Sequence, residues 1–435
     1  MPEEASVPAS VTEDVVPRLG PVPAEQRIDI IDILRGFALF GVLLINMRNF
    51  DLPGQEWTGT VDQVALWLTI AFGDSKFWTL FSFLFGLGFA LQMGRAEARG
   101  VRFRRVYLRR LGVLLLFGAL HHLIYGGDIL FDYAAVGFLL LLFRARSSRT
   151  TLLVASVCFV IPLVQFALDV RARELARVNP QIAQLAARET ARREAQRVVG
   201  MEEFLRISTG GSFQEVVAYH ARVFAQRYST LGAYLWQPGG PGGMLGGPFP
   251  LFLLGLYAGR RRIFQNLSAY LPFIRKALPW ALGIGLVGTL VSVAGQWPTQ
   301  AVPYSHSTRH LTGILWFVGT PALSFSYASV IILLVQKEAW MKLLTPLAAV
   351  GRTALTNYLL QSLIFTTMFY GYGLGLYGEI GPSLNVALTL LIYTFQVALS
   401  VWWLRRFRFG PMEWLWRTLT YDKLQPMRRQ PIAAA

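Results

Sequence analysis

The chain has 435 residues, of which 54% are hydrophobic and only 15% are charged. This composition excludes an ordinary soluble domain and indicates an integral membrane protein. The 41 basic and 25 acidic side chains give a net charge of +16, and the basic residues stand in short clusters between apolar runs. That distribution indicates membrane topology and argues against nucleic-acid binding. Cys158 is the single cysteine, which excludes an internal disulfide and a multi-cysteine metal site.

Residues 1–27 contain acids and prolines without an apolar core, so we expect a disordered cytoplasmic tail and no signal peptide. Crossing the hydrocarbon takes about 20 mostly apolar residues. Ten candidate spans follow, at residues 28–47, 77–93, 111–125, 129–143, 152–168, 248–258, 277–294, 311–335, 354–370 and 384–404. Residues 61–72 are apolar but too few to cross, and we expect them to lie at the interface or dip back.

The basic residues support this count. Connections after every second span hold 25 of the 41, whereas the opposite short loops hold almost none, with Lys76 and Arg309 the main exceptions. The positive-inside rule then places both termini in the cytoplasm. We therefore predict an all-α, polytopic transmembrane helical bundle with about ten spans, in contact with membrane lipids.

The spans divide into two halves of five, residues 28–168 and 248–408, followed by a second cytoplasmic tail at 409–435. Residues 169–247 lie outside the membrane in this topology. Their apolar spacing at Leu175, Val178, Ile182 and Leu185 predicts one amphipathic helix, and a second begins at a capping box, Ser212 to Glu215. Such helices either cover the outer surface or select a substrate. The Gly/Pro-rich residues 237–248 predict a re-entrant loop.

The histidines share one property, because all five fall at or beyond the outer ends of spans: His121, His122, His220, His306 and His310. Histidine suits proton transfer near neutral pH, although outer loops are generally polar as well. His306 and His310 have no accompanying carboxylate, so no metal site is expected. His121 and His122 end an apolar segment, where an imidazole without a role would be costly. Asp128 either orients one of these rings or caps the next helix.

Charged residues also stand near the inner ends of spans. Asp29, Asp32 and Arg35 recur every three residues, so Asp32 and Arg35 form either a structural ion pair or part of a site for an anionic ligand. An arginine cluster follows the second span, at Arg102, Arg104, Arg105, Arg109 and Arg110. Its residues either hold the phosphates of a nucleotide-like molecule or serve orientation and contact with anionic lipids. No P-loop, dinucleotide fingerprint or nucleophile elbow occurs.

Polar side chains occur within one late span, at Thr356, Asn357, Gln361 and Ser362. We expect them to form interhelical hydrogen bonds.

Five sequence blocks resemble the YeiB or DUF418 family of bacterial membrane proteins. They are residues 27–46, 80–90, 127–130, 351–362 and 409–417, which include the runs RIDIIDILRGFALFGVLLIN and GRTALTNYLLQS. The resemblance extends from Arg27 to Arg429. It implies a relation to membrane acyltransferases, which move acyl groups from cytoplasmic acyl-CoA to acceptors on the far side, with an acyltransferase-like N-terminal half and a DUF418 C-terminal half.

In those acyltransferases the first span carries an arginine and, after ten intervening residues, a catalytic histidine. Here Arg35 matches but Asn46 stands in place of the histidine, and asparagine is no general base. Arg110 and His121 have that spacing on the third span, where eleven steps turn about 20° past three full turns. We therefore expect His121 as the base, with His122 and Asp128 beside it. Arg35, Arg102, Arg105, Arg109 and Arg110 are the expected acyl-CoA contacts.

The acceptor in this interpretation is a hydroxyl or an amine of a small molecule, lipid or glycan. The alternative is a non-catalytic transporter or binding protein for a lipid or small molecule, with the interrupted sixth span as its gate.

Overall fold

The computed structural model describes residues 28–52, 55–100, 103–229, 243–294 and 306–429. The expected disordered tail and most of the expected re-entrant loop lie outside these ranges. The described residues form a helical bundle without a named strand, in agreement with the predicted all-α fold.

The N-terminal half begins with α1, Asp29–Arg48, and α2, Thr60–Leu68. A π-helical turn, Thr69–Gly73, ends α2, and Ser75 at φ 63° starts a new helix. The helices that follow are α3 (Lys76–Ala98), α4 (Phe103–His122), α5 (Leu130–Gly137) with a 3-10 segment (Phe138–Phe143), and α6 (Ser148–Val178).

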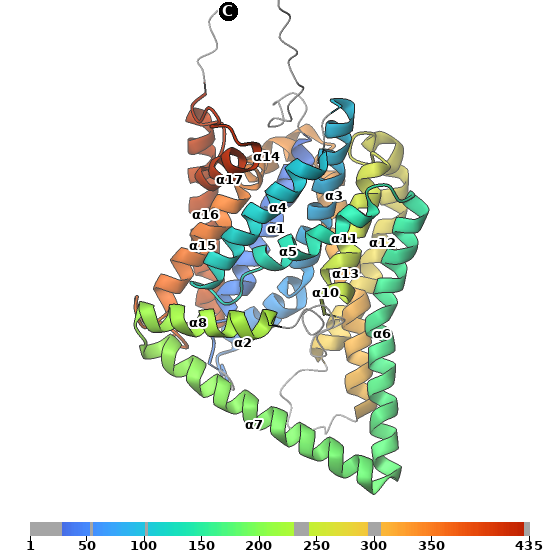
Figure 1. Ribbon diagram of the computed structural model, residues 1–435, viewed down its shortest axis with the longest axis vertical. Helices are drawn as coiled ribbons and strands as arrows, with labels where there is room; N and C mark the ends of the chain where they lie inside the picture. The colour runs from blue at the N-terminus through green and yellow to red at the C-terminus, as the bar shows by residue number, and fades with distance from the viewer. Residues whose placement is uncertain (1–27, 53–54, 101–102, 230–242, 295–305, 430–435) are drawn as a thin grey trace, which may run out of the picture.

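Two helices lead away from α6 and back to the bundle. Helix α7, Pro180–Gly210, runs obliquely past one end of the bundle, and α8, Phe213–Tyr228, returns across it (Figure 1). The predicted capping box is confirmed, because Ser212 and Glu215 bind each other's backbone. The prediction of one helix through Leu175 and Leu185 is wrong, since the chain breaks at Asn179. Pro180 cannot continue the hydrogen bonding of α6, and the Asn179 side chain caps α7 instead.

The C-terminal half consists of seven further helices and one short turn of helix. They are α10 (Gly243–Gly246), α11 (Pro248–Arg260), α12 (Leu267–Ala294), α13 (His306–Leu334), α14 (Glu338–Arg352), α15 (Ala354–Phe369), α16 (Pro382–Arg406) and α17 (Pro411–Tyr421). Helices α14 and α17 lie at the end of the bundle opposite α7 and α8 (Figure 1).

Six helices in the described residues are long and apolar enough to cross a membrane. The segments are Asp29–Arg48, Thr60–Ala98, Ser148–Val178, Leu267–Ala294, Thr312–Leu334 and Pro382–Arg406. The other expected spans are α4, which carries several arginines, and the shorter α5, α11 and α15, of 8, 13 and 16 residues.

Glycines let two pairs of helices pack with their backbones in contact. A Cβ on Gly36 of α1 would collide with the Leu347 carbonyl of α14, and one on Gly351 would collide with the Asp32 carbonyl. Gly86 of α3 and Gly255 of α11 have the same relationship. Close packing of this kind is typical of helices in membranes. Small residues let the two backbones approach, and van der Waals contact then holds the helices together.

Candidate functional site: an arginine-lined cavity and a histidine–aspartate pair

A cavity of about 510 Å³ opens at the end of the bundle where α14 and α17 lie. Its described walls contain the arginines Arg35, Arg95, Arg110, Arg262, Arg352, Arg408 and Arg417. Asp32 is the one acidic residue among those described lining residues. The cavity is therefore strongly positive, and guanidinium groups are the preferred donors to phosphate oxygens.

The packing of neighbouring side chains orients two of these arginines. Arg35 donates from Nη1 to Oδ1 of Asp32 at 2.9 Å, one helical turn away on α1. The guanidinium of Arg110 lies 3.6 Å from the ring centroid of Trp416, whose indole N–H donates to the Arg110 carbonyl at 3.0 Å. Helix α17 thus fixes Arg110 through its tryptophan. Arg262 follows α11 in a left-handed conformation, with φ 52°, which non-glycine residues rarely adopt.

The five arginines expected to contact acyl-CoA do not all lie at the cavity. Arg35 and Arg110 line the cavity. Arg105 and Arg109 are exposed on the outer face of α4, and Arg109 donates to Asp422 at 2.8 Å. That bond lowers the pKa of Asp422 below its ordinary value. Arg102 lies outside the described residues.

Arginines from distant segments complete the cavity. Arg352 and Arg417 belong to the family blocks 351–362 and 409–417, and Arg408 directly precedes the second block. These family blocks were the sequence signal that could have singled out the arginines. The sequence does not show, however, that they lie beside the arginines of α1 and α4.

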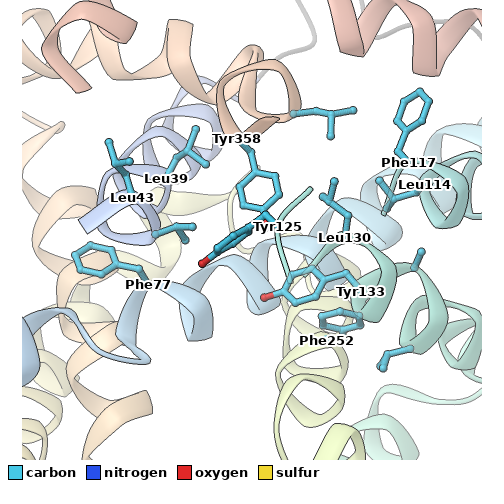
Figure 2. Close-up of a cluster of buried hydrophobic side chains, with 14 of the residues drawn as sticks. Leu39, Leu43, Phe77, Leu114, Phe117, Tyr125, Leu130, Tyr133, Phe252 and Tyr358 are labelled. Atoms are coloured by element: carbon cyan, nitrogen blue, oxygen red, sulfur yellow. The ribbon is translucent and has the colours of Figure 1, made fainter. Parts of the chain in front are cut away.

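A second cavity of about 190 Å³ shares walls with the first, including Arg35, Arg110 and Arg352, and continues into the bundle. Its deeper walls are leucine, phenylalanine and tyrosine side chains, ending at Tyr133 and Tyr358. In Figure 2 these two tyrosines lie amid buried apolar side chains, among them Leu130. A polar mouth thus leads to an apolar interior.

Glu413 of α17 supports the wall of this second cavity. Its Oε1 accepts the N–H of Leu355 at 2.6 Å and that of Thr356 at 3.1 Å, so the carboxyl group caps the start of α15. Its Oε2 accepts the Thr356 hydroxyl at 2.6 Å. Burial is the largest effect on this carboxyl group and raises its pKa above the ordinary value.

The polar residues of α15 form the interhelical hydrogen bonds expected of them. The Asn357 amide donates to Ser400 Oγ of α16 at 2.9 Å, and the Gln361 amide donates to Gln396 Oε1 at 2.8 Å. Ser362 instead bonds within its own helix.

His121 lies just beyond the apolar cavity. Its ring centroid is 5.1 Å from that of Tyr358, and its Nδ1 is 2.7 Å from Oδ1 of Asp128. Oδ2 of Asp128 accepts the Phe131 N–H at 2.9 Å, so this carboxylate orients the imidazole and also caps α5. The Nε2 of His121 is buried without a hydrogen-bond partner in the described residues. An acid, an imidazole that it orients and a nitrogen without a partner are the elements that a general base requires.

His122 has different surroundings, although it too is buried. Its ring packs against Phe224 of α8 at 5.1 Å and lies 6.3 Å from the ring of His220. Neither of its nitrogens has a hydrogen-bond partner in the described part of the chain. The structure therefore pairs Asp128 with His121 and leaves His122 in an aromatic contact.

Helix α8 covers this region at the end of the bundle opposite α14 and α17 (Figure 1). Asp132 of α5 accepts Arg227 Nη2 at 2.9 Å and the Tyr228 hydroxyl at 2.7 Å. His220 is buried beside the Leu123 carbonyl, 3.3 Å from its Nδ1, and burial lowers the pKa of His220. Of the remaining histidines, His306 and His310 have side chains outside those described.

The fold and the cavities define a helical membrane protein with an internal cavity that is lined by arginines at its mouth and by apolar side chains further in. Residues 258–423 match the family model described as protein of unknown function (DUF418). YxaH of Bacillus subtilis is 33% identical over 426 residues, covering 95% of this chain and 98% of its own length. YeiB of Escherichia coli is 29% identical over 420 residues, covering 92% and 98%. The chain belongs to the DUF418 family, together with YxaH and YeiB.

Proposed function

We propose that this protein is an acyltransferase of the bacterial cytoplasmic membrane. In this proposal it takes an acyl group from cytoplasmic acyl-CoA and transfers it to a hydroxyl or amine acceptor on the outer side. The observation that carries the proposal is an arginine-lined cavity that shares walls with an apolar one, whose lining residue Tyr358 contacts the buried histidine–aspartate pair.

Each part of an acyl-CoA has a counterpart along this path. The phosphates suit the arginines of the first cavity, and the pantetheine arm, which joins the phosphates to the thioester, spans the second cavity towards His121. Arg110 and His121 lie eleven residues apart on α4, about 16 Å along the axis and nearly on one face. In this proposal the phosphates of acyl-CoA contact one end of α4, and its thioester contacts the other end.

The chemical step follows from the His121 geometry. Asp128 holds the proton of Nδ1, so Nε2 accepts the proton of the acceptor as its oxygen or nitrogen attacks the thioester carbonyl. The carbon–sulfur bond then breaks, and the imidazolium returns the proton to the leaving thiolate. His121 replaces the histidine that related acyltransferases have where this chain has Asn46.

The proposed topology has ten spans and cytoplasmic termini. It places Ser212 outside and Arg262 in the cytoplasm. Cysteine substitutions at these positions, in a background lacking Cys158, test it with an impermeant thiol reagent on intact cells. Labelling at position 212 and not at 262 supports the topology, and labelling at 262 without permeabilisation overturns it.

The decisive experiment compares His121→Ala with His122→Ala in membranes supplied with radiolabelled acyl-CoA and the native acceptor fraction. Loss of a general base costs about a hundred- to ten-thousandfold in rate. We expect this loss for His121→Ala, with acyl-CoA binding intact, and a milder effect for His122→Ala. Acyl transfer that survives His121→Ala contradicts the assigned base.

A transporter or binding protein is the alternative function. Its support is α11, a 13-residue helix that starts inside the bundle after a Gly/Pro-rich segment. Wild-type protein that neither binds nor turns over acyl-CoA of any chain length favours this alternative.

A further inference from the structure

The wall of the apolar cavity contains a hydroxyl group with a free proton, that of Tyr358 on α15. The side chain is buried, and Figure 2 shows it between Leu39 and Leu130, which line the same cavity. Its oxygen accepts the Ile129 N–H at 3.3 Å. Within the described chain no acceptor takes the hydroxyl proton. A phenol both accepts and donates, so Tyr358 can donate to a molecule in the cavity.

The other tyrosines that line this cavity in the described residues differ in this respect. The Tyr133 hydroxyl donates to the Trp78 carbonyl at 3.1 Å and lies 2.7 Å from Ser82 Oγ. The Tyr107 hydroxyl donates to the Gly137 carbonyl at 3.3 Å. Their protons satisfy backbone carbonyls of the bundle, and only that of Tyr358 is available to a ligand.

Tyr358 also lies beside the proposed base. Its ring centroid is 5.1 Å from that of His121. Its hydroxyl binds the N–H of Ile129, the residue directly after Asp128, and Asp128 in turn binds Nδ1 of His121. The two oxygens of Asp128 point to His121 and to the Phe131 N–H. One short turn of the chain therefore positions the imidazole and the phenol next to each other.

Acyl transfer places negative charge on one particular atom. As the acceptor oxygen or nitrogen bonds to the thioester carbon, an electron pair of the carbonyl double bond moves onto the carbonyl oxygen. The pair returns when the carbon–sulfur bond breaks. A donor held in advance beside this oxygen stabilises the charge as it forms, and a phenol keeps its proton at neutral pH.

We propose that the Tyr358 hydroxyl donates a hydrogen bond to the thioester oxygen of bound acyl-CoA, so that Tyr358 is a second catalytic residue beside His121. His121 takes the proton of the acceptor and returns it to the leaving thiolate. The Tyr358 proton stays on its phenol, so the proton balance of the transfer is unchanged. This inference rests on the proposed acyltransferase function.

Tyr358→Phe isolates the hydroxyl, because phenylalanine retains the ring that packs on His121. Loss of one donor of this kind costs about a hundred- to thousandfold in kcat. We expect this loss with little change in the KM for acyl-CoA, because the bond strengthens only as charge develops and the arginines hold the phosphates. Transfer from radiolabelled acyl-CoA to the native acceptor fraction measures both constants.

Tyr393→Phe is the matched control for the loss of a buried hydroxyl. Tyr393 of α16 donates to the Gly36 carbonyl at 2.6 Å and lines neither cavity. This variant should lower the Tm at least as much as Tyr358→Phe and leave kcat close to that of the wild type. Tyr133→Phe, in the cavity wall, should reduce kcat far less than Tyr358→Phe, because its hydroxyl already donates to Trp78.

A spectroscopic measurement detects the hydrogen bond without turnover. The probe is the ketone analogue of acetyl-CoA in which a methylene replaces the thioester sulfur, with a 13C label at the carbonyl. This analogue has no thiolate to lose, so it stays intact in the site. Donation from a phenol weakens the carbonyl bond. The infrared stretch of the bound analogue should therefore lie at lower frequency in the wild type than in Tyr358→Phe.

Wild-type kcat in Tyr358→Phe, or the same carbonyl frequency in both proteins, overturns the assignment of Tyr358 and leaves the acyltransferase proposal in place. Absence of transfer by the wild-type protein overturns both. If Tyr358→Phe does not fold, 3-fluorotyrosine at position 358 decides the matter. It packs like tyrosine but is a stronger donor, so it should lower the carbonyl frequency further, and an unchanged frequency overturns the assignment.

Discussion

One carboxylate, that of Asp128, lies 2.7 Å from Nδ1 of His121 through Oδ1 and accepts the Phe131 N–H through Oδ2 at 2.9 Å. The sequence left two interpretations of this residue, as the partner of an imidazole or as a helix cap. The structure shows both at once, because the two oxygens of one side chain point to different partners.

This double role makes Asp128 variants informative. Asp128→Asn retains an oxygen for the Phe131 N–H but presents no carboxylate to Nδ1, so acyl transfer should fall about a hundred- to ten-thousandfold with little change in Tm. Asp128→Ala removes the cap as well and should also cost about 1 kcal/mol of stability. Parallel transfer assays and thermal denaturation check this. Full activity in Asp128→Asn would contradict the role of the carboxylate in orienting His121.

Two adjacent arginines of α4 provide a matched pair with which to test the arginine-lined cavity. Arg110 lines it, whereas Arg109 faces outward and pairs with Asp422. Arg110→Met should weaken acyl-CoA binding by about tenfold or more, and Arg109→Met should leave it almost unchanged. Isothermal titration with acyl-CoA measures both. Equal losses would show that long-range charge, and not the cavity, holds the molecule.

The ion pair of α1 should contribute to stability whatever the function. The side chain of Asp32 is 10% exposed and that of Arg35 is 32% exposed. Arg35→Met removes the ion-pair partner of Asp32 and leaves only the other arginines of the cavity as positive charges around this carboxylate. We expect a loss towards the lower end of about 3 to 5 kcal/mol, because the cavity still admits some water. The double change with Asp32→Asn should restore part of the Tm, and equal losses in the single and the double variants would show no coupling.

His220 predicts a pH dependence for the docking of α8. Burial lowers its pKa below the ordinary value of 6.5, so the docked state binds fewer protons than the undocked state once the pH falls below 6.5. Docking should therefore be fully stable above that pH and weaken as the pH falls through and below it.

Hydrogen exchange of residues 213–228 at about pH 7.5 and about pH 5.5, corrected for intrinsic rates, measures this loss of protection. His220→Gln should reduce the difference between the two pH values. An unchanged difference would assign the effect to another group, with His122 the nearest histidine ring described.

The helical class and many helix positions could be predicted from the sequence, because apolar runs and caps are local signals. The capping box at Ser212 is an example. The break at Asn179 was missed because apolar spacing continues smoothly across it, while the proline that ends the hydrogen bonding is a single residue. The spacing of apolar residues indicates which face of a helix is buried, but it does not show whether the backbone hydrogen bonding continues from one turn to the next.

The site could be predicted only where its residues are close in sequence. His121 and Asp128 share one turn, and Arg35 and Arg110 stood out through their position and spacing. Arg95, Arg262 and Arg408 meet them through packing between helices far apart in the chain. Lys76 looked like a minor exception to the charge pattern, because sequence alone does not show that the ammonium is buried.

The cap that Glu413 provides for α15 has a consequence for biosynthesis. The residues of helix α15 are complete in the nascent chain while Glu413, about 44 residues beyond the Phe369 that ends this helix, is still to be synthesised. Until then the N–H groups of Leu355 and Thr356 lack this acceptor. Trp416, which fixes Arg110, arrives later still. The residues that cap α15 and pack on Arg110 therefore join the chain last, so an incomplete chain lacks the contacts that order the walls of the arginine-lined cavity.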